Sequence, residues 1–268
     1  KNDKFNKEIF SKLASKKVRL NIENKISYAN KIKSGLLEIL FINKDTSIQY
    51  KITENSLEFL SNDNKDTYVG KLDFKPFYLN ANFNYEGIST KNLFDENSLF
   101  IDIINSEILN NKNLNAYFSL NVKDITNIDE LNNLDLKVSI EEGEIIFSES
   151  QIMWKENLDV ILNDGTILLN ESGINLIGSI LLKFKDIDNF YSSFQIPKKN
   201  RKDINELKLD FIYNFSSKNI SFDNPKINGS QNQNLENFLD RSNSKDNSAL
   251  NKIKFKNFIN NFFKAYAG

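Results

Sequence analysis

The chain has 268 residues, with 35 basic residues (Lys and Arg) against 36 acidic ones (Asp and Glu), and it contains no histidine and no cysteine. This charge balance argues against a nucleic-acid-binding protein, which needs a basic excess to meet the phosphates. Without His and Cys the chain lacks the commonest general base, the commonest metal ligand and the commonest soft nucleophile. We therefore expect a protein without catalytic activity and without a cofactor. No run of about 18 apolar residues occurs that would predict a membrane-spanning helix.

Residues 1–16 predict a short amphipathic helix. Phe5, Ile9 and Leu13 lie at helical spacing among lysines, so one face of such a helix is apolar. From Lys17 the apolar residues recur at every second position instead, so we expect the helix to end there and a β-domain to begin.

Residues 17–229 contain one run after another in which polar and apolar residues alternate. The clearest run is 77–85, where Phe77, Leu79 and Phe83 alternate with asparagines. A period of two is the pattern of a strand with one dry and one wet face. Roughly a dozen such runs, separated by turn signals and few helices, predict a mainly β domain with a long, curved antiparallel sheet in meander order.

Helices and a linker are predicted toward the C-terminus. A short helix is expected at 186–194, with Asp186 as its N-cap. Residues 230–249 are polar and rich in Asn and Ser, which predicts a linker, with a helical turn around 235–239 as the one exception. Residues 250–268 predict the strongest amphipathic helix of the chain. We expect it to dock on the sheet, because docking buries its apolar stripe within the chain, and a position on a membrane surface is the alternative. That stripe consists of Phe255, Phe258, Ile259, Phe262, Phe263 and Tyr266.

Each of two charged segments can be interpreted as a functional site or simply as a solvent-exposed surface. Four glutamates lie within 141–149, and paired carboxylates carry glycosidase chemistry. Alternation places most of them outward or in turns, which favours a solvated face. The basic turn at 198–202 can meet phosphate head groups, but Asp203 and Glu206 follow it closely, so solvation is again the preferred interpretation.

Several loose motifs follow one another in the second half of the chain. They are a Gly-initiated strand at 143–147, a G-x-x-x-x-G-x-I strand at 173–180, a short helix at 187–194 followed by Pro197, and a terminal helix at 255–263. In their order they resemble the C-terminal region of AsmA-like proteins, the repeating β-groove family of envelopes with two membranes. The first half of the chain matches this family only in its style of alternating strands.

The resemblance implies a curved antiparallel sheet folded into a trough with an apolar lining. Members of this family are held at the inner membrane by an N-terminal helix and extend through the periplasm. They are thought to carry phospholipid toward the outer membrane or to support its assembly. Because the chain opens on Lys1, we expect it to be the C-terminal piece of a longer protein with a membrane anchor upstream. The expected partners are phospholipid or another acyl-chain lipid, and no nucleic acid.

The alternation of polar and apolar residues leads to the hypothesis of a lipid-binding groove independently of the family resemblance. A sheet with one apolar face must cover it with a second sheet, with helices or with a ligand, and few helices are predicted here. We therefore expect lipid to fill the groove. The alternative is a closed β-sandwich, serving as a structural, carbohydrate-binding or adhesive module. The candidate lipid-lining residues are Phe77, Leu79, Phe83, Leu114, Phe118, Leu120, Leu136, Val138, Ile140, Leu176, Ile180, Leu182, Leu209, Phe211 and Phe215.

Overall fold

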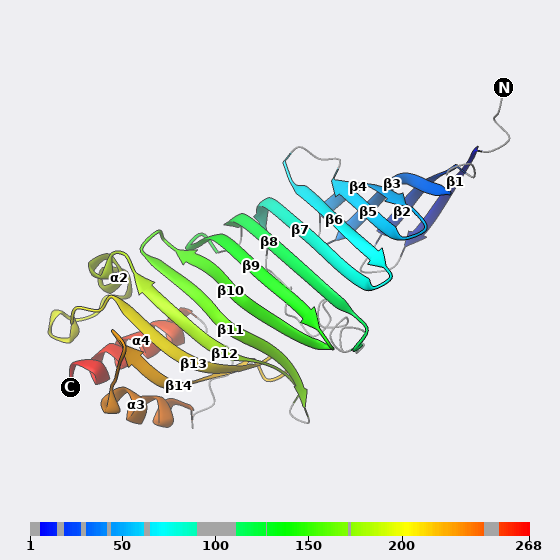
Figure 1. Ribbon diagram of the computed structural model, residues 1–268. Coiled ribbons are helices and arrows are strands. Elements are labelled where there is room, and N and C mark those ends of the chain that lie inside the picture. Colours follow the sequence, from blue (N-terminus) through cyan, green and yellow to red (C-terminus); the bar gives the residue numbers. More distant parts are fainter. Residues whose placement is uncertain are drawn as a thin grey trace. The chain divides into compact units, whose positions relative to one another are not determined.

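The computed structural model of the protein describes residues 6–14, 19–27, 31–41, 44–61, 65–89, 111–126, 128–170, 173–243 and 252–268. Within these ranges the chain is mainly β, with fifteen strands and three α-helices (Figure 1). The hydrogen-bonded order of the strands follows chain order from β1 to β15. Pairing is mostly antiparallel, while β7 and β8 pair in parallel. The prediction of a mainly β, antiparallel meander is confirmed, and the parallel pair is a departure from it.

The chain divides into two compact units. Unit 1 comprises Lys1–Ile128 with Lys137–Gly143, and unit 2 comprises Asp129–Leu136 with Glu144–Gly268. The predicted sheet domain over 17–229 therefore extends over both units, and strand β9 (Leu131–Glu141) contributes residues to each. The other strands of unit 1 are β1 (Asn6–Ala14), β2 (Arg19–Ser27), β3 (Ile32–Phe41), β4 (Lys44–Ile52), β5 (Ser56–Ser61), β6 (Thr67–Phe74), β7 (Phe77–Ile88) and β8 (Asn115–Ile125).

The N-terminal segment forms a strand, so the helix predicted over 1–16 is wrong where the structure describes it. β1 pairs antiparallel with β2 along its whole length, from Asn6 opposite Ser27 to Ala14 opposite Arg19. An isolated helix this short is marginal in water. Pairing with β2 instead satisfies the backbone along one edge of β1, and this outweighs the helical spacing of the apolar residues.

Alternation sorts the side chains of unit 1 onto two faces. In the antiparallel pair of β6 and β7, Leu72 lies opposite Leu79. In the parallel pair of β7 and β8, Leu120 lies beside Phe83. Cross-strand partners point to the same side of a sheet, so these apolar residues share one face. The asparagines between them on β7 belong to the other face.

The strands of unit 2 lie beside all three helices that the structure describes. The strands are β10 (Glu144–Trp154), β11 (Leu158–Asn170), β12 (Gly173–Phe184), β13 (Glu206–Asn214), β14 (Asn219–Ile227) and β15 (Ser230–Gln231). The helices are α2 (Ile187–Phe194), α3 (Gln233–Asn243) and α4 (Lys252–Ala267), with a 3-10 turn at Lys198–Asn200.

The polar linker predicted over 230–249 is wrong over its described part, and residues 244–249 lie outside the described residues. β15 forms the first two residues, and α3 follows and packs against β14. Leu235 and Leu239 are 0% and 1% exposed. Four residues apart, they lie on one side of the helix and are its two buried residues. Their burial outweighs the polar composition around them.

Two predicted helices are confirmed. Asp186 caps α2, because its Oδ1 accepts a hydrogen bond from the backbone N–H of Asn189 at 2.9 Å. α4 is the expected C-terminal helix, and it is docked, since Phe262 and Phe263 are buried in the core of unit 2. Among the residues that the structure describes, no helix is long and apolar enough to cross a membrane.

The core of unit 2 lies between the sheet and the three helices. Strand residues such as Leu158 and Leu207 meet helix residues such as Phe190 there. Each buried apolar side chain contributes about 1.5–3 kcal/mol relative to exposure, so the helices stabilise this part of the sheet by covering it. The fully assembled cluster contains Leu158, Phe190, Tyr191, Ile196, Ile204, Leu207, Leu209, Ile227, Leu235, Leu239, Phe262 and Phe263.

Candidate functional site

One face of the unit 1 sheet is apolar across five consecutive strands, β4 to β8. Register and alternation place its members side by side on neighbouring strands. This apolar face consists of Ile48, Tyr50, Ile52, Leu57, Phe59, Tyr68, Leu72, Phe74, Phe77, Leu79, Ala81, Phe83, Tyr85, Ala116, Phe118, Leu120 and Val122.

Aromatic rings on the apolar face pack against small residues. The ring centroids of Phe59 and Phe83 are 6.5 Å apart, and those of Tyr68 and Phe83 are 6.0 Å apart. The Phe59 ring fills the space beside Gly70, because a Cβ added to Gly70 would lie 2.1 Å from Cζ of Phe59. Ala81, the partner of Gly70 on β7, is 1% exposed. The absence of a side chain at Gly70 therefore leaves room for the Phe59 ring.

Several larger side chains of the apolar face are incompletely buried, although Tyr68 is only 2% exposed. Leu79, Phe83, Phe118 and Leu120 are half-buried, and Phe77 is 42% exposed. The described residues of unit 1 contain no helix that covers this face. The apolar face is therefore partly exposed to water. Binding of an apolar ligand to it would release that water, which favours binding.

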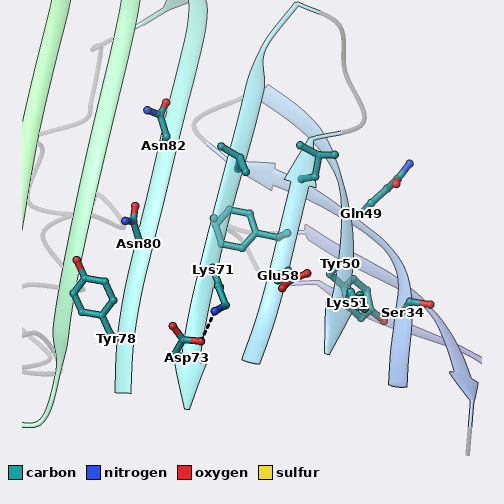
Figure 2. Close-up of a pocket in the computed structure, with 14 residues that line it drawn as sticks. Ser34, Gln49, Tyr50, Lys51, Glu58, Lys71, Asp73, Tyr78, Asn80 and Asn82 are labelled. Atoms are coloured by element: carbon teal, nitrogen blue, oxygen red, sulfur yellow. Dashed lines mark ion pairs between the residues drawn. The ribbon is translucent and has the colours of Figure 1, made fainter. Parts of the chain in front are cut away.

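The opposite face of the same sheet is hollowed (Figure 2). A hollow of about 780 Å³ extends over β3 to β7, a size within the range of ligand pockets. From β7 it takes Tyr78, Asn80 and Asn82, which alternate with members of the apolar face. Most of its lining belongs to the face opposite the apolar one, whereas Tyr50, Phe59 and Gly70 share the row of the apolar face. The full lining is Ser34, Gln49, Tyr50, Lys51, Glu58, Phe59, Leu60, Val69, Gly70, Lys71, Asp73, Tyr78, Asn80 and Asn82.

An exposed apolar pair lies within the hollow. Leu60 on β5 and Val69 on β6 are cross-strand partners, and they are 54% and 50% exposed. Their next neighbours along the same row are polar, with Gln49 on β4 and Asn82 on β7. The hollow therefore has an apolar patch bordered by side-chain amides.

The charges in the hollow offset one another. Lys51, Glu58 and Lys71 follow each other across β4, β5 and β6. Lys71 also forms an ion pair with Asp73, with Nζ 2.8 Å from Oδ1. The hydrogen bond to Asp73 and the charge of that carboxylate raise the pKa of Lys71, and Glu58 adds to the shift. This alternation of sign suits a neutral polar ligand better than an anion.

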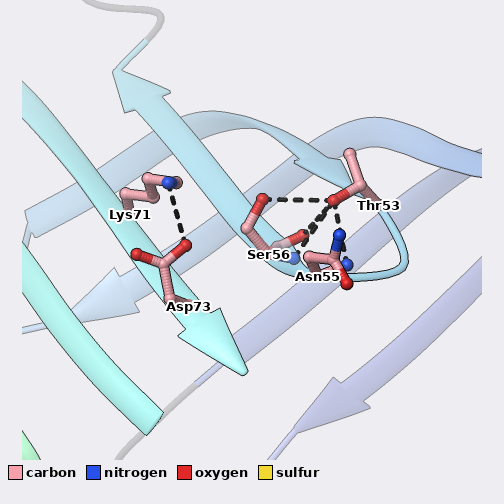
Figure 3. A network of polar contacts seen from close by, with 5 residues as sticks. All are labelled: Thr53, Asn55, Ser56, Lys71 and Asp73. Atoms are coloured by element: carbon pink, nitrogen blue, oxygen red, sulfur yellow. Dashed lines mark hydrogen bonds and ion pairs between the residues drawn. The ribbon is translucent and has the colours of Figure 1, made fainter. Parts of the chain in front are cut away.

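A hydrogen-bonded turn orders one end of the hollow (Figure 3). Oγ1 of Thr53 accepts hydrogen bonds from the backbone N–H of Asn55 at 3.3 Å and of Ser56 at 3.1 Å. Its hydroxyl is also 3.1 Å from the Ser56 hydroxyl. Ser56 is in turn the strand partner of Asp73. The turn thus joins β4 to β5 and places Ser56 of β5 opposite Asp73, which with Lys71 belongs to β6.

Polar side chains also bridge the parallel pair. Nδ2 of Asn121 donates to Oδ1 of Asn84 at 3.1 Å, and Nδ2 of Asn84 donates to Oγ1 of Thr67 at 3.0 Å. The three residues lie on β8, β7 and β6, so the ladder crosses from the antiparallel to the parallel register. It holds these strands in the register that aligns the apolar face behind them.

The structure brings together five of the predicted lining residues of unit 1. Phe77, Leu79, Phe83, Phe118 and Leu120 share the apolar face. Leu114 lies directly before β8 and is half-buried. On β9, Val138 is half-buried and Ile140 is buried, while Leu136, which belongs to unit 2, is half-buried.

The predicted lining residues of unit 2 have different surroundings. Leu209 belongs to the helix-covered core, and Ile180 and Leu182 pack against that core. Phe211 and Phe215 are each 7% exposed, and Leu176 is half-buried, on the same face of β12 and β13. In this unit protein side chains from the helices cover part of the face that the sequence assigned to lipid.

Sequence reasoning missed the hollow. Leu60 and Val69 are apolar residues at positions where the alternation calls for polar ones, since Glu58 and Lys71 share their face. An apolar residue in the polar phase of a strand is the signal that would have marked them.

Neither the protein-family models nor the curated proteins contain a match to this chain. Among the described residues, no group of three or more His, Cys, Asp and Glu side chains is placed to hold a metal ion.

Proposed function

We propose that this is a non-enzymatic envelope protein that binds acyl-chain lipid on the apolar face of unit 1. The observation that supports this most is the contrast in cover. The unit 2 sheet has three helices packed on its apolar face, whereas the described part of unit 1 supplies none for an equally regular face.

Acyl chains match the chemistry of this face. Burial of apolar surface is non-directional, and each methylene removed from water contributes about 0.8 kcal/mol. Phe83, Phe118 and Leu120 offer rings and a branched chain on two neighbouring strands. Such a face holds many chains of different length and saturation, which fits a carrier better than a selective receptor.

The resemblance to AsmA-like proteins adds the cellular setting to this proposal. In this proposal the protein is periplasmic, is tethered to the inner membrane by an upstream segment, and either conducts phospholipid along the groove toward the outer membrane or supports the assembly of that membrane. The apolar face of unit 1 is then a stretch of the lipid path.

Phe77 and Tyr78 provide a matched pair for the test. They are adjacent on β7, 42% and 40% exposed, and they belong to the apolar face and the hollow respectively. The protein is purified without detergent, extracted with organic solvent and examined by lipid mass spectrometry. We expect near-stoichiometric lipid in the unaltered protein and in Tyr78→Asp, and roughly fivefold less in Phe77→Asp, because a charge among the acyl chains is costly.

Further variants make the result independent of a folding defect. Leu120→Asp repeats the test on β8, and the circular dichroism spectrum of each variant must match that of the unaltered protein. A folded protein without lipid, or folded Phe77→Asp and Leu120→Asp with undiminished lipid, contradicts the proposal. If only Tyr78→Asp lost lipid, the binding site would be the hollow and not the apolar face.

A polar-ligand module is the second candidate function, and the hollow favours it. Tyr78, Asn80 and Asn82 place a ring and two amides in a row beside the Leu60–Val69 patch. Aromatic rings and planar amides are the groups that a neutral carbohydrate contacts. Titration of mono- and oligosaccharides followed by NMR tests this, and Tyr78→Ala should abolish any shift that occurs.

A further inference from the structure

The last helix of unit 2 is unusually basic. α4 contains four lysines, Lys252, Lys254, Lys256 and Lys264, and no acidic residue, in a chain whose net charge is −1. Three of these lysines lie in its first five residues. Positive charge at a helix N-terminus is unfavourable, because the backbone dipole is already positive there. Stability of the helix therefore does not explain this arrangement.

A second acid-free segment runs alongside α4. Near the start of α4, Nζ of Lys256 donates to Oε1 of Gln195 at 2.6 Å, and Nδ2 of Asn260 donates to the Phe194 carbonyl at 2.9 Å. Near its end, Nζ of Lys202 donates to the Tyr266 carbonyl at 3.4 Å. Residues 194–202 thus follow α4 along its length.

The two segments together form what we call the basic strip. Residues 194–202 add Lys198, Lys199, Arg201 and Lys202 to the four lysines of α4, again with no acidic residue. Lys198 and Lys199 are exposed. The acidic residues on neighbouring elements are Asp186, Asp188, Asp203, Asp223, Glu236 and Asp240.

Exposed apolar residues lie at one end of the basic strip. Ile253 is 72% exposed and Phe255 is 39% exposed, both in the first turn of α4. The second half of the same helix is buried, with Phe262 and Phe263 at 2% and 1%. The helix is therefore anchored in unit 2 at one end and presents apolar side chains beside lysines at the other.

We propose that the basic strip docks on an anionic lipid surface. Lysines meet the phosphates of the head groups, and Ile253 and Phe255 enter the boundary between head groups and acyl chains. The charge of the strip is complementary to anionic lipid, and the exposed apolar end favours a bilayer over an acidic protein. The surface lies in unit 2 and uses no residue of the apolar face of unit 1, so it is independent of the function proposed there.

Vesicle flotation tests the proposal with the full chain. Vesicles of phosphatidylcholine alone are compared with vesicles in which roughly one third is phosphatidylglycerol. We expect flotation with the anionic vesicles only, and its loss when the salt concentration is raised to about 1 M. The double variant Lys198→Glu/Lys199→Glu should bind on the order of tenfold more weakly.

Two controls separate this surface from net charge and from lipid uptake by unit 1. Lys208→Glu/Lys226→Glu reverses two exposed lysines that are strand partners on β13 and β14, and it should bind as the unaltered protein does. Phe77→Asp should also retain binding. For the apolar end, Ile253→Glu should weaken binding, whereas Ile212→Glu, at a sheet position 41% exposed, should not.

Several outcomes overturn the proposal. Equal flotation with both vesicle compositions would show that anionic charge is not what the protein recognises. Equal losses in the two double lysine variants would reduce the effect to net charge. Absence of flotation with either composition would leave an acidic protein as the partner of the basic strip and would exclude the bilayer.

Discussion

Units 1 and 2 are built from the same kind of alternating strand, but their apolar faces are completed differently. In unit 2, residues such as Leu158 and Leu207 are 4–5% exposed beneath three helices. In unit 1, Leu79, Phe83 and Leu120 stay half-buried, and the described residues include no helix over them. Alternation determines that a strand has a dry face, whereas the neighbouring elements determine what keeps it dry. Only an open face is available for a ligand.

The largest effect on stability is expected when a buried side chain in the helix-covered core of unit 2 is truncated. Phe263 is 1% exposed and packs edge-on against Tyr191, with ring centroids 5.1 Å apart. Phe263→Ala should lower the free energy of unfolding of unit 2 by about 3–5 kcal/mol, because a large cavity remains. Trp154, the single tryptophan, contacts Phe190 and Phe194 and reports this unfolding by fluorescence in a urea titration.

Phe83→Ala is the matching change in the open face of unit 1. Phe83 is half-buried, so its removal should cost less than half as much, and Trp154 should not report it because it belongs to unit 2. Equal losses in the free energy of unfolding for Phe83→Ala and Phe263→Ala would mean that the apolar face of unit 1 is covered as completely as that of unit 2. The two faces would then not differ in cover.

Alkaline pH should lower the free energy of unfolding of unit 2. Burial raises the pKa of Tyr191 to about 12, with the Asp188 and Asp203 carboxylates adding to the shift, and the phenol donates to the Lys202 carbonyl. A raised pKa contributes stability that is complete below the unfolded value of about 10 and is lost as pH rises through 12. Unit 2 should therefore lose roughly 2 kcal/mol between pH 10 and 12, measured by urea titration at each pH.

Tyr191→Phe separates this tyrosine from the others. The variant should lose about 1 kcal/mol at pH 7 with its hydrogen bond, and its stability should then fall less steeply above pH 10. An unchanged slope in Tyr191→Phe would assign the pH dependence to other tyrosines, such as Tyr213, whose pKa burial also raises.

Gly70 probes how tightly the open face is packed. A Cβ at this position would meet the Phe59 ring, so Gly70→Ala should destabilise unit 1 by about 1–2 kcal/mol as the ring moves aside. Thermal unfolding followed by circular dichroism measures the loss. In the double variant with Phe59→Leu the added methyl group no longer meets the ring, and the cost of Gly70→Ala should largely vanish. Additive costs would show that the ring is not what limits the space.

The strands could be predicted because their signal is local. The alternation of Phe77, Leu79 and Phe83 with asparagines specifies both a strand and its dry face, and Asp186 marks the start of α2. β1 could not be predicted, because its pairing with β2 is a tertiary interaction that overrides helical spacing. α3 was predicted only as a helical turn around 235–239, because Leu235 and Leu239 are a small apolar minority in a polar segment.

The candidate site was predictable only in part, for the same reason. Residues of unit 1 that share a phase, such as Leu79 and Leu120, were correctly grouped on one face. The phase of Leu209 is equally clear, but periodicity carries no information on whether a helix or a ligand covers it, and here the core of unit 2 does. The hollow depends on the pairing of Leu60 with Val69, which the sequence does not specify.

The smallest effect is expected from the ion pair in the hollow. The Lys71 and Asp73 side chains are 52% and 37% exposed, and an ion pair in contact with water gains little over its hydrated partners. The pKa of Lys71 is raised by its hydrogen bond and its charged neighbours, and not by burial. Lys71→Met should therefore leave the melting temperature of unit 1 unchanged, and about 1 M salt should not alter that of the unaltered protein. A clear fall in either experiment would mean that charges of the hollow stabilise unit 1, so that this unit depends on specific contacts as unit 2 does, and its open face would need another explanation.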